Sequence, residues 1–251
     1  MVKAWALMVA LALPGLALAA GPDDAFDRAS QAYAKGNWNE AAEGFQELLR
    51  YGFRDARLEY NLAGAEYKRG RLGQAVLHYE RARRLDPGDH DTIANLEPVR
   101  SKLRDVVPAD PSESGIVGAI RRFQDRWGVT AQAAVALAGV WAAAFLLVVG
   151  ASRSGGFTPG RSWLLAGALL VALAVGASWR ATDRRLYGAR RAVVLAPSVE
   201  ALAGPGLENT ALFTLHEGTT VVVRTERDGW LQVALPNGLS GWVARDAAER
   251  I

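Results

Sequence analysis

The sequence predicts a multidomain membrane protein made of α-helical hairpin repeats, a two-helix transmembrane hairpin and a small all-β barrel. Three observations support this prediction. Tyr, Gly, Ala and one aromatic position recur at a 34-residue interval near the N-terminus, two uncharged apolar runs lie in the middle, and short β-branched runs separated by turn residues fill the last part. The 251 residues carry a net charge of +3 and include no cysteine, which excludes disulfides, thiolate metal sites and cysteine nucleophiles.

Residues 1–20 are predicted to be a signal peptide. Lys3 precedes a short apolar run that is broken by Pro14, and Ala17 and Ala19 form an Ala-x-Ala pattern before the polar segment GPDD. An uncleaved anchor helix is the alternative, although the run is short for a membrane span. In both interpretations residue 21 onward lies across the membrane from Lys3.

Residues 21–105 are predicted to form helical hairpins. The 34-residue interval separates Tyr33 from Tyr67, Gly36 from Gly70, Ala41 from Ala75, and Phe45 from Tyr79. This period is typical of helix-turn-helix repeats. The glycines suit the left-handed backbone between two helices, and the alanines allow the helices to approach closely. We therefore expect repeats at 22–55 and 56–89 and a closing helix at 90–105.

These residues resemble the tetratricopeptide repeat, and the second unit matches the family pattern at Asn61, Leu62, Tyr67, Gly70, Ala75, Tyr79, Ala82 and Pro87. The resemblance implies a protein-binding groove along the first helix of each unit. Its binding residues would be Phe26, Tyr33, Arg57, Tyr60, Tyr67 and Lys68. Aromatic and basic walls suit an extended segment of some acidic character. Because two units are fewer than the three that such repeats usually need, we predict that residues 21–105 alone are marginally stable.

Residues 106–191 are predicted to hold the membrane hairpin. A linker and interfacial helix at 106–128, with Ile116, Ile120 and Phe123 on one face, lead into transmembrane helix 1 at 129–149. A loop at 150–162, transmembrane helix 2 at 163–179 and a basic linker at 180–191 follow. Trp127, Trp163 and Trp179 stand at the ends of the spans, where indole rings favour the membrane interface.

The signal peptide and the arginines predict opposite orientations of this hairpin. The signal peptide places the loop at 150–162 in the cytoplasm and both soluble parts outside it. The loop has two arginines, whereas the outer flanks carry Arg121, Arg122, Arg126, Arg180, Arg184, Arg185, Arg190 and Arg191, and positive charges favour the cytoplasmic side. We prefer the orientation set by the signal peptide because it acts first during synthesis.

Residues 192–251 are predicted to form the small barrel. The runs AVVL, ALFTL, TTVVVRTE, GWLQVAL and SGWVA alternate with turn residues, and Leu231, Val233 and Leu235 should share the face opposite Trp230. From Glu217 the segment resembles a bacterial SH3 domain, whose signature residues here are Gly218, Gly229, Trp230, Gly241 and Trp242. We interpret them as mainly structural, with glycine at turns and tryptophan in the barrel wall. Relatives of this type often bind cell-wall peptide or another protein.

The sequence contains no pattern that predicts catalysis, a cofactor or a metal. The three histidines are scattered, with His78 expected on a repeat surface and His216 in a turn. A Gly-rich phosphate loop, a paired-His helix and a GxSxG segment are all absent from the sequence. No basic stretch interleaves with aromatic residues on a soluble segment, so nucleic acid is not an expected partner, and the arginines indicate lipid headgroups or a solvated flank.

The order of these parts resembles the repeat proteins of the Bat aerotolerance operon. The resemblance implies a non-enzymatic scaffold in the bacterial inner membrane that serves envelope stress tolerance. Its partners would be membrane proteins with von Willebrand A domains and, indirectly, a MoxR-type AAA ATPase. Two alternatives remain open, namely a membrane protein that binds or senses peptidoglycan and an accessory subunit of an envelope enzyme.

Overall fold

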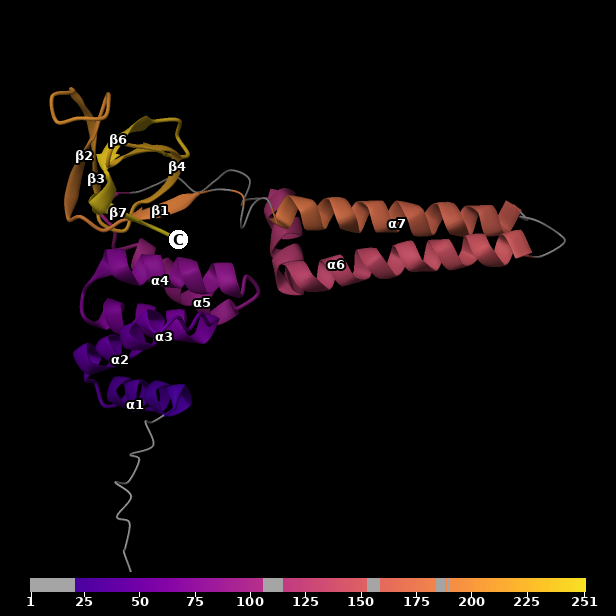
Figure 1. Cartoon of the computed structure of the whole chain (residues 1–251), viewed down its shortest axis with the longest axis horizontal. Coiled ribbons are helices and arrows are strands. Elements are labelled where there is room, and N and C mark those ends of the chain that lie inside the picture. The colour runs from indigo at the N-terminus through magenta and orange to yellow at the C-terminus, as the bar shows by residue number, and fades with distance from the viewer. Residues whose placement is uncertain (1–20, 106–114, 153–158, 184–187, 189) are drawn as a thin grey trace, which may run out of the picture.

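The computed structural model describes residues 21–105, 115–152, 159–183, 188 and 190–251. Figure 1 shows a stack of helices, a C-terminal sheet that lies against one end of this stack, and a long helical pair that extends to one side. The predicted signal peptide at 1–20 falls outside the described residues.

The stack consists of paired helices, namely α1 (Pro22–Ala34), α2 (Trp38–Arg50), α3 (Ala56–Lys68), α4 (Leu72–Leu85) and α5 (His90–Arg100). α1, α3 and α5 begin 34 residues apart, as do α2 and α4, so the predicted period is also the period of the structure. Gly36 and Gly70 have φ angles of +81° and +78° between the helices of each pair. The left-handed backbone expected of these glycines is therefore confirmed.

The buried residues of the stack form two apolar clusters. The first joins α1, α2 and α3 around Phe45 and Leu62, both fully buried. The second joins α3, α4 and α5 around Leu77 and Leu96. This second cluster also contains Val193 from the C-terminal sheet. The apolar interior thus continues from the helices into the sheet.

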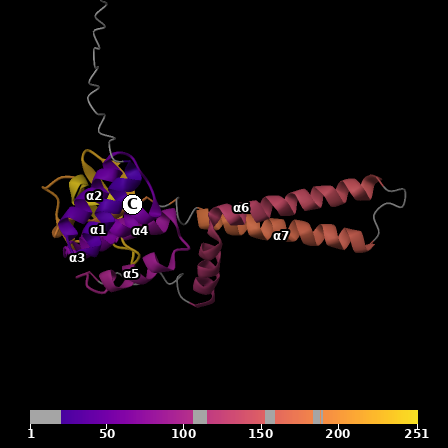
Figure 2. The same ribbon diagram turned by 90° about the horizontal axis from the view of Figure 1, so that it is seen from below.

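The long pair consists of α6 (Gly115–Ser152) and α7 (Pro159–Asp183). We expected a separate interfacial helix before the first apolar run; this segment is the first part of α6, which bends between it and the apolar run. The reason is that the junction contains Gly128 and no proline, and one glycine weakens a helix without ending it. Figure 2 shows the first part of α6 lying across the axis of the pair. Ile116 and Phe123 are exposed there, and the side chain of Ile120 lies outside the description.

Within the described residues, one segment is long and apolar enough to cross a membrane, namely the 20 residues Thr130–Val149 of α6. The apolar stretch of α7, Ala166–Thr182, is shorter. The expected boundaries also move, because α6 continues to Ser152 and α7 begins at Pro159. Residues 153–158 of the expected loop lie outside the described residues.

Small residues form the contact between α6 and α7. A Cβ atom added to Gly139 would lie 3.1 Å from the Cβ of Ala172, and Ala143 is 2% exposed. Ser178 donates a hydrogen bond of 3.1 Å to the side-chain oxygen of Gln132, which is itself buried. Large apolar side chains such as Trp141 point outward instead. The pair therefore has a small, tightly packed interior and an apolar exterior.

The sheet has seven antiparallel strands in the order β3-β2-β6-β5-β4-β1-β7. They are β1 (Arg191–Val194), β2 (Ser198–Leu202), β3 (Ala211–His216), β4 (Thr220–Arg227), β5 (Trp230–Ala234), β6 (Ser240–Ala244) and β7 (Ala248–Arg250), with the 3-10 helix η3 (Arg245–Ala247) before β7. Sequence reasoning missed β2, whose outer positions are Ser198 and Glu200, and β7, which is only three residues long. The other five strands lie where the runs predicted them.

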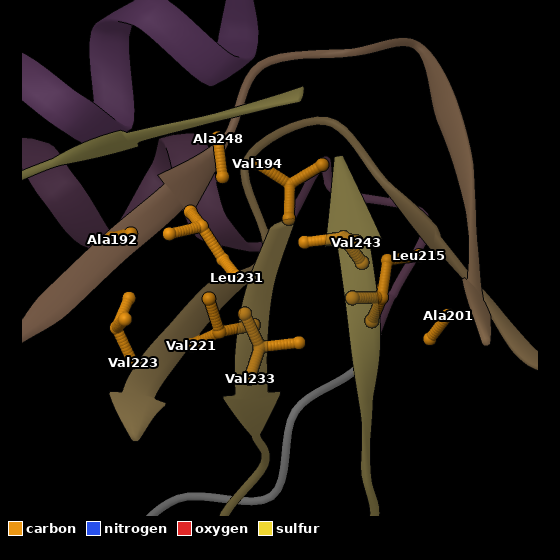
Figure 3. Packing of buried hydrophobic residues seen from close by; sticks show 10 residues of the cluster. All are labelled: Ala192, Val194, Ala201, Leu215, Val221, Val223, Leu231, Val233, Val243 and Ala248. Atoms are coloured by element: carbon orange, nitrogen blue, oxygen red, sulfur yellow. The ribbon is translucent and has the colours of Figure 1, made fainter. Parts of the chain in front are cut away.

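The alternation of β5 places the predicted residues in the core. Leu231 and Val233 are fully buried, Leu235 packs against the same cluster, and Trp230 lies on the other face. Figure 3 shows Leu231 and Val233 among the buried side chains of neighbouring strands. Asp228 and Gly229 connect β4 to β5 with φ angles of 51° and 81°, the signs required by a type I′ hairpin turn.

The end of the helical stack is fastened to the sheet by Asp105. One carboxylate oxygen accepts hydrogen bonds from the backbone N–H of His216 at 2.7 Å and from the hydroxyl of Thr219 at 2.6 Å. The other lies 2.7 Å from Nδ1 of His216. Burial raises the pKa of Asp105, but the hydrogen bonds from Thr219 and His216 outweigh burial and hold this pKa below its usual value. The carboxylate is therefore the form that joins the two parts.

Four further contacts extend this junction. Leu103 packs so closely on Gly218 that a side chain on that glycine would overlap it. Arg81 of α4 donates to a carboxylate oxygen of Glu249 at 2.7 Å and to the carbonyl of Arg250 at 2.6 Å. Arg84 donates to the carbonyl of Ile251 at 2.6 Å. Sheet and helices therefore pack as one body, in which β1 and β7 lie against α4.

Candidate interaction surface

Three tyrosines on the first helices of the two hairpins form the centre of the candidate surface. Tyr33 reaches from α1 to α3, where a Cβ added to Gly64 would lie 3.2 Å from its hydroxyl oxygen. Tyr60 and Tyr67 stand one turn before and one turn after Gly64 on the same face of α3. The small residue between them therefore leaves room for the third ring. Edge contacts hold two of these rings, with Tyr33 4.9 Å from Trp38 and Tyr60 5.8 Å from Tyr79 between centroids.

Three cations on this face each lie over an aromatic ring. The Arg57 guanidinium is 6.0 Å from the ring centre of Phe26, Lys68 Nζ is 5.8 Å from that of Trp38, and Lys102 Nζ is 4.7 Å from that of Tyr67. Cations in this position are attracted by the negative face of the ring. We call the set of Phe26, Tyr33, Trp38, Arg57, Tyr60, Tyr67, Lys68 and Lys102 the aromatic surface. All six residues predicted from the sequence belong to it.

Sequence reasoning missed the contribution of Trp38 and of the chain after α4. Asn95 of α5 donates a hydrogen bond of 2.7 Å to the Tyr60 hydroxyl, and Lys102 donates one of 2.6 Å to the Tyr67 hydroxyl. The repeat period could have revealed Lys102, because it follows Lys68 by 34 residues. Trp38 had no such signal, since Leu72 occupies the same place in the second hairpin.

The phenol groups of Tyr33 and Tyr60 stay neutral at physiological pH. Burial raises the pKa of Tyr33, and burial together with Asp91 and Asp89 raises that of Tyr60, although the hydrogen bond from Asn95 lowers it in part. Neutral hydroxyls can donate hydrogen bonds outward, and Arg57 and Lys68 are exposed beside them. The surface therefore presents donors and positive charge, which favour acceptors and carboxylates on a ligand.

The SH3 signature residues lie at turns and on the outer face of the sheet. Gly218 and Gly229 have φ angles of +84° and +81° in turns. Gly241, expected at a turn, instead lies inside β6, where a Cβ would come within 2.9 Å of the Cβ of Ala201. Trp230 and Trp242 are half-buried on the face opposite the core. They form part of the sheet wall and keep one side toward the exterior.

Two histidines do not lie where the sequence suggested. His78, expected on a repeat surface, is 5% exposed, and its Nδ1 lies 2.7 Å from a carboxylate oxygen of the buried Glu59. Hydrogen bonding to Glu59 on α3 compensates for the loss of water around both side chains. His216, expected in a turn, ends β3 and binds Asp105. The described part of the chain contains no group of His, Asp and Glu that could hold a metal ion.

The sheet matches a known family. Residues 202–248 match the bacterial SH3 domain family, which confirms the resemblance seen in the sequence of this part. The whole chain has no significant match among curated proteins. The fold and this match define a helical-hairpin protein with a C-terminal sheet of the bacterial SH3 type. Its described residues include one helix that is long and apolar enough to span a membrane, which is compatible with membrane association. β1 and nearly all of β7, the strands that dock on α4, lie outside the matched residues.

Proposed function

We propose that this protein is a membrane-anchored, non-enzymatic scaffold that binds an extended segment of a protein partner on the aromatic surface. The supporting observation is a set of partly exposed aromatic rings that each have a cation over them. The pairs are Arg57 over Phe26, Lys68 over Trp38 and Lys102 over Tyr67. Tyrosine and arginine are enriched among the residues that dominate binding energy at interfaces. A segment with aromatic or acidic side chains would find matching contacts there.

The proposal includes two membrane crossings rather than one. Asp105 precedes α6, and His216 and Thr219 follow α7, yet these three residues are hydrogen-bonded to one another. The parts before and after the long pair therefore lie on the same side of any membrane, which requires an even number of crossings between them. If Thr130–Val149 crosses the membrane, the chain must return, and the antiparallel neighbour α7 is the described helix that can provide the return. Its flanking Trp163 and Trp179 would compensate for a short apolar stretch.

We further propose that the hairpins are tetratricopeptide repeats and that the scaffold serves the Bat aerotolerance or envelope stress system. In the order of its parts the chain resembles BatE, the repeat protein of that operon. The expected partners are von Willebrand A-domain Bat proteins, with a MoxR-type AAA ATPase in the same system. The location that fits this role is the bacterial inner membrane, with the helices and the sheet outside the cytoplasm.

Co-purification from detergent-solubilised membranes tests the binding surface. The variants Tyr60→Ala and Tyr67→Ala should lose most of the co-purifying membrane protein, because each removes a ring and the hydroxyl that Asn95 or Lys102 contacts. Tyr51→Ala is the matched control, since Tyr51 is 72% exposed and lies outside the aromatic surface. Equal recovery with all three variants would refute the assignment of the surface.

Cysteine labelling in intact cells tests the membrane arrangement, and the lack of native cysteine makes single-site labelling clean. Cysteine is placed at Gly88, Gly155 or Asn237, and a membrane-impermeant maleimide is added. We expect labelling at 88 and 237 and none at 155. Labelling at 155 alone would reverse the orientation, as the arginine distribution predicts, and different results for 88 and 237 would contradict the even number of crossings.

A second candidate function is binding of peptidoglycan, and the match of residues 202–248 to bacterial SH3 domains supports it. The half-buried Trp230 and Trp242 on the outer face of the sheet would supply the stacking surface for a wall peptide or sugar. Sedimentation of the detergent-solubilised chain with purified wall material, compared with Trp242→Ala, separates this role from the scaffold role. If the intact chain stays in the supernatant, peptidoglycan binding is excluded.

A further inference from the structure

A hollow lies where the helices α2 and α4 meet the sheet. It has a volume of about 770 Å³ and is lined by α2, α4, the buried pair of Glu59 and His78, and the chain end at Glu249, Arg250 and Ile251. Volumes of this size are typical of small-molecule sites. Because one wall comes from the helices and the other from β7, the hollow exists only while the two parts are docked.

Positive charge dominates this hollow. Its lining contains five arginines, Arg50, Arg54, Arg81, Arg84 and Arg250, and the two carboxylates of Glu59 and Glu249. Arg81 is paired with Glu249, and Arg250 is paired with Glu226 outside the lining. Arg81 and Arg84 reach across to β7 and the last residue, and Arg54 caps the end of α2 by donating to the carbonyl of Leu49 at 2.7 Å. These bonds fix the direction of the guanidinium groups. Arg50 is exposed at the rim, and no side chain of the described residues pairs with it.

A buried polar group faces the same space. His78 lines the hollow and is 5% exposed, and its Nδ1 is shared with Glu59 at 2.7 Å. The pair therefore places a buried polar group beside the guanidinium groups of the hollow.

We propose that this hollow, which we call the arginine hollow, binds a small organic polyanion that carries phosphate or carboxylate groups. Guanidinium groups bind both kinds of anion in bidentate fashion, while Leu49, Leu85 and Ile251 supply an apolar side for the organic part. The ligand would contact the helices and the sheet together. Its binding would therefore strengthen the junction, in addition to any partner binding on the aromatic surface.

Inorganic pyrophosphate and citrate serve as probes on the full chain in detergent, at constant ionic strength. Titration calorimetry should detect binding, and Arg50→Gln should weaken it about tenfold, as expected for one lost charged hydrogen bond. Arg28→Gln on α1 is the control, because it removes the same charge from an exposed position outside the hollow. Binding of pyrophosphate alone would assign a phosphate ligand, and binding of citrate alone a carboxylate ligand.

Two results would overturn the proposal. One is the absence of heat with both probes at millimolar concentration. The other is an equal loss of affinity in Arg28→Gln and Arg50→Gln, which would reveal a general charge effect. A second measurement tests the role of the junction, since Asp105→Ala should also weaken probe binding although residue 105 lies outside the hollow. Unchanged affinity in that variant would show that the site does not depend on docking of the sheet.

Discussion

Replacing Asp105 by alanine should release the helical stack from the sheet. The carboxylate accepts from the backbone N–H of His216 at 2.7 Å and from Thr219 at 2.6 Å, and it lies 2.7 Å from the His216 ring. Hydrogen bonds to a charged group contribute about 1.5–3 kcal/mol each when buried. The Asp105 side chain is 21% exposed, which weakens them. We therefore expect a loss of about 3 kcal/mol, or roughly a hundredfold shift in the docking equilibrium.

Energy transfer between two dyes measures this loss. The chain contains no cysteine, so dyes attached to Gly88→Cys on the helices and Asn237→Cys on the sheet report on the junction without any native cysteine having to be replaced. Urea titration in detergent should give a lower midpoint for the drop in transfer in Asp105→Ala. The control is Asp27→Ala, an exposed aspartate of α1. If both variants lose transfer at the same urea concentration, Asp105 does not hold the junction.

Four further predictions concern the junction, the long pair and the helical stack. Acidification should open the junction. The lowered pKa of Asp105 stabilises the docked state at pH values above 3.8, the ordinary pKa of this group, and this stability is lost as the pH falls through the folded-state pKa. Energy transfer that stays constant until the Asp105 carboxylate is fully protonated would contradict this prediction. Gly218→Ala should lower the free energy of unfolding by about 2 kcal/mol more than Gly229→Ala. Both glycines have positive φ, but only Gly218 packs on Leu103. Equal urea midpoints for the two variants would show that the contact with Leu103 does not contribute to stability. Gly139→Val should separate α6 from α7, because the new side chain would press on Ala172, whereas Gly167→Val fills open space and serves as the control. Disulfide formation between cysteines placed at Gln132 and Ser178 measures the separation. Equal cross-linking in the two variants would argue against this contact. A fragment of residues 21–105 should melt below the full chain, since it loses Val193 from the second apolar cluster, and a sharp transition at the temperature of the full chain would show that the sheet is dispensable.

The repeat period predicted most of the stack, because it is a local property of the chain. Tyr33, Tyr60 and Tyr67 could be assigned to one face since helices of equal length recur at equal spacing. Trp38 and the Asn95 contact to Tyr60 could not be assigned in this way. They depend on how one helix is placed against the next, and a single period does not fix that placement.

The junction could not be predicted, because its residues are far apart in the sequence. Asp105 and His216 are separated by the long pair of α6 and α7, and neither stands out in its local sequence pattern. The error at His78 has the same origin. A histidine in an amphipathic helix is expected at the surface, and only the packing of α3 against α4 shows that Glu59 is positioned to pair with it.

The position of the long pair between two parts that touch has a consequence for biosynthesis. The covering strand β1 begins at Arg191, 86 residues after Asp105, so α4 and α5 leave the ribosome well before Val193 can cover their apolar face. At ordinary translation speeds this interval lasts about 4 to 17 s. During this interval the long pair is synthesised. The junction between helices and sheet can therefore form only after the long pair has been synthesised.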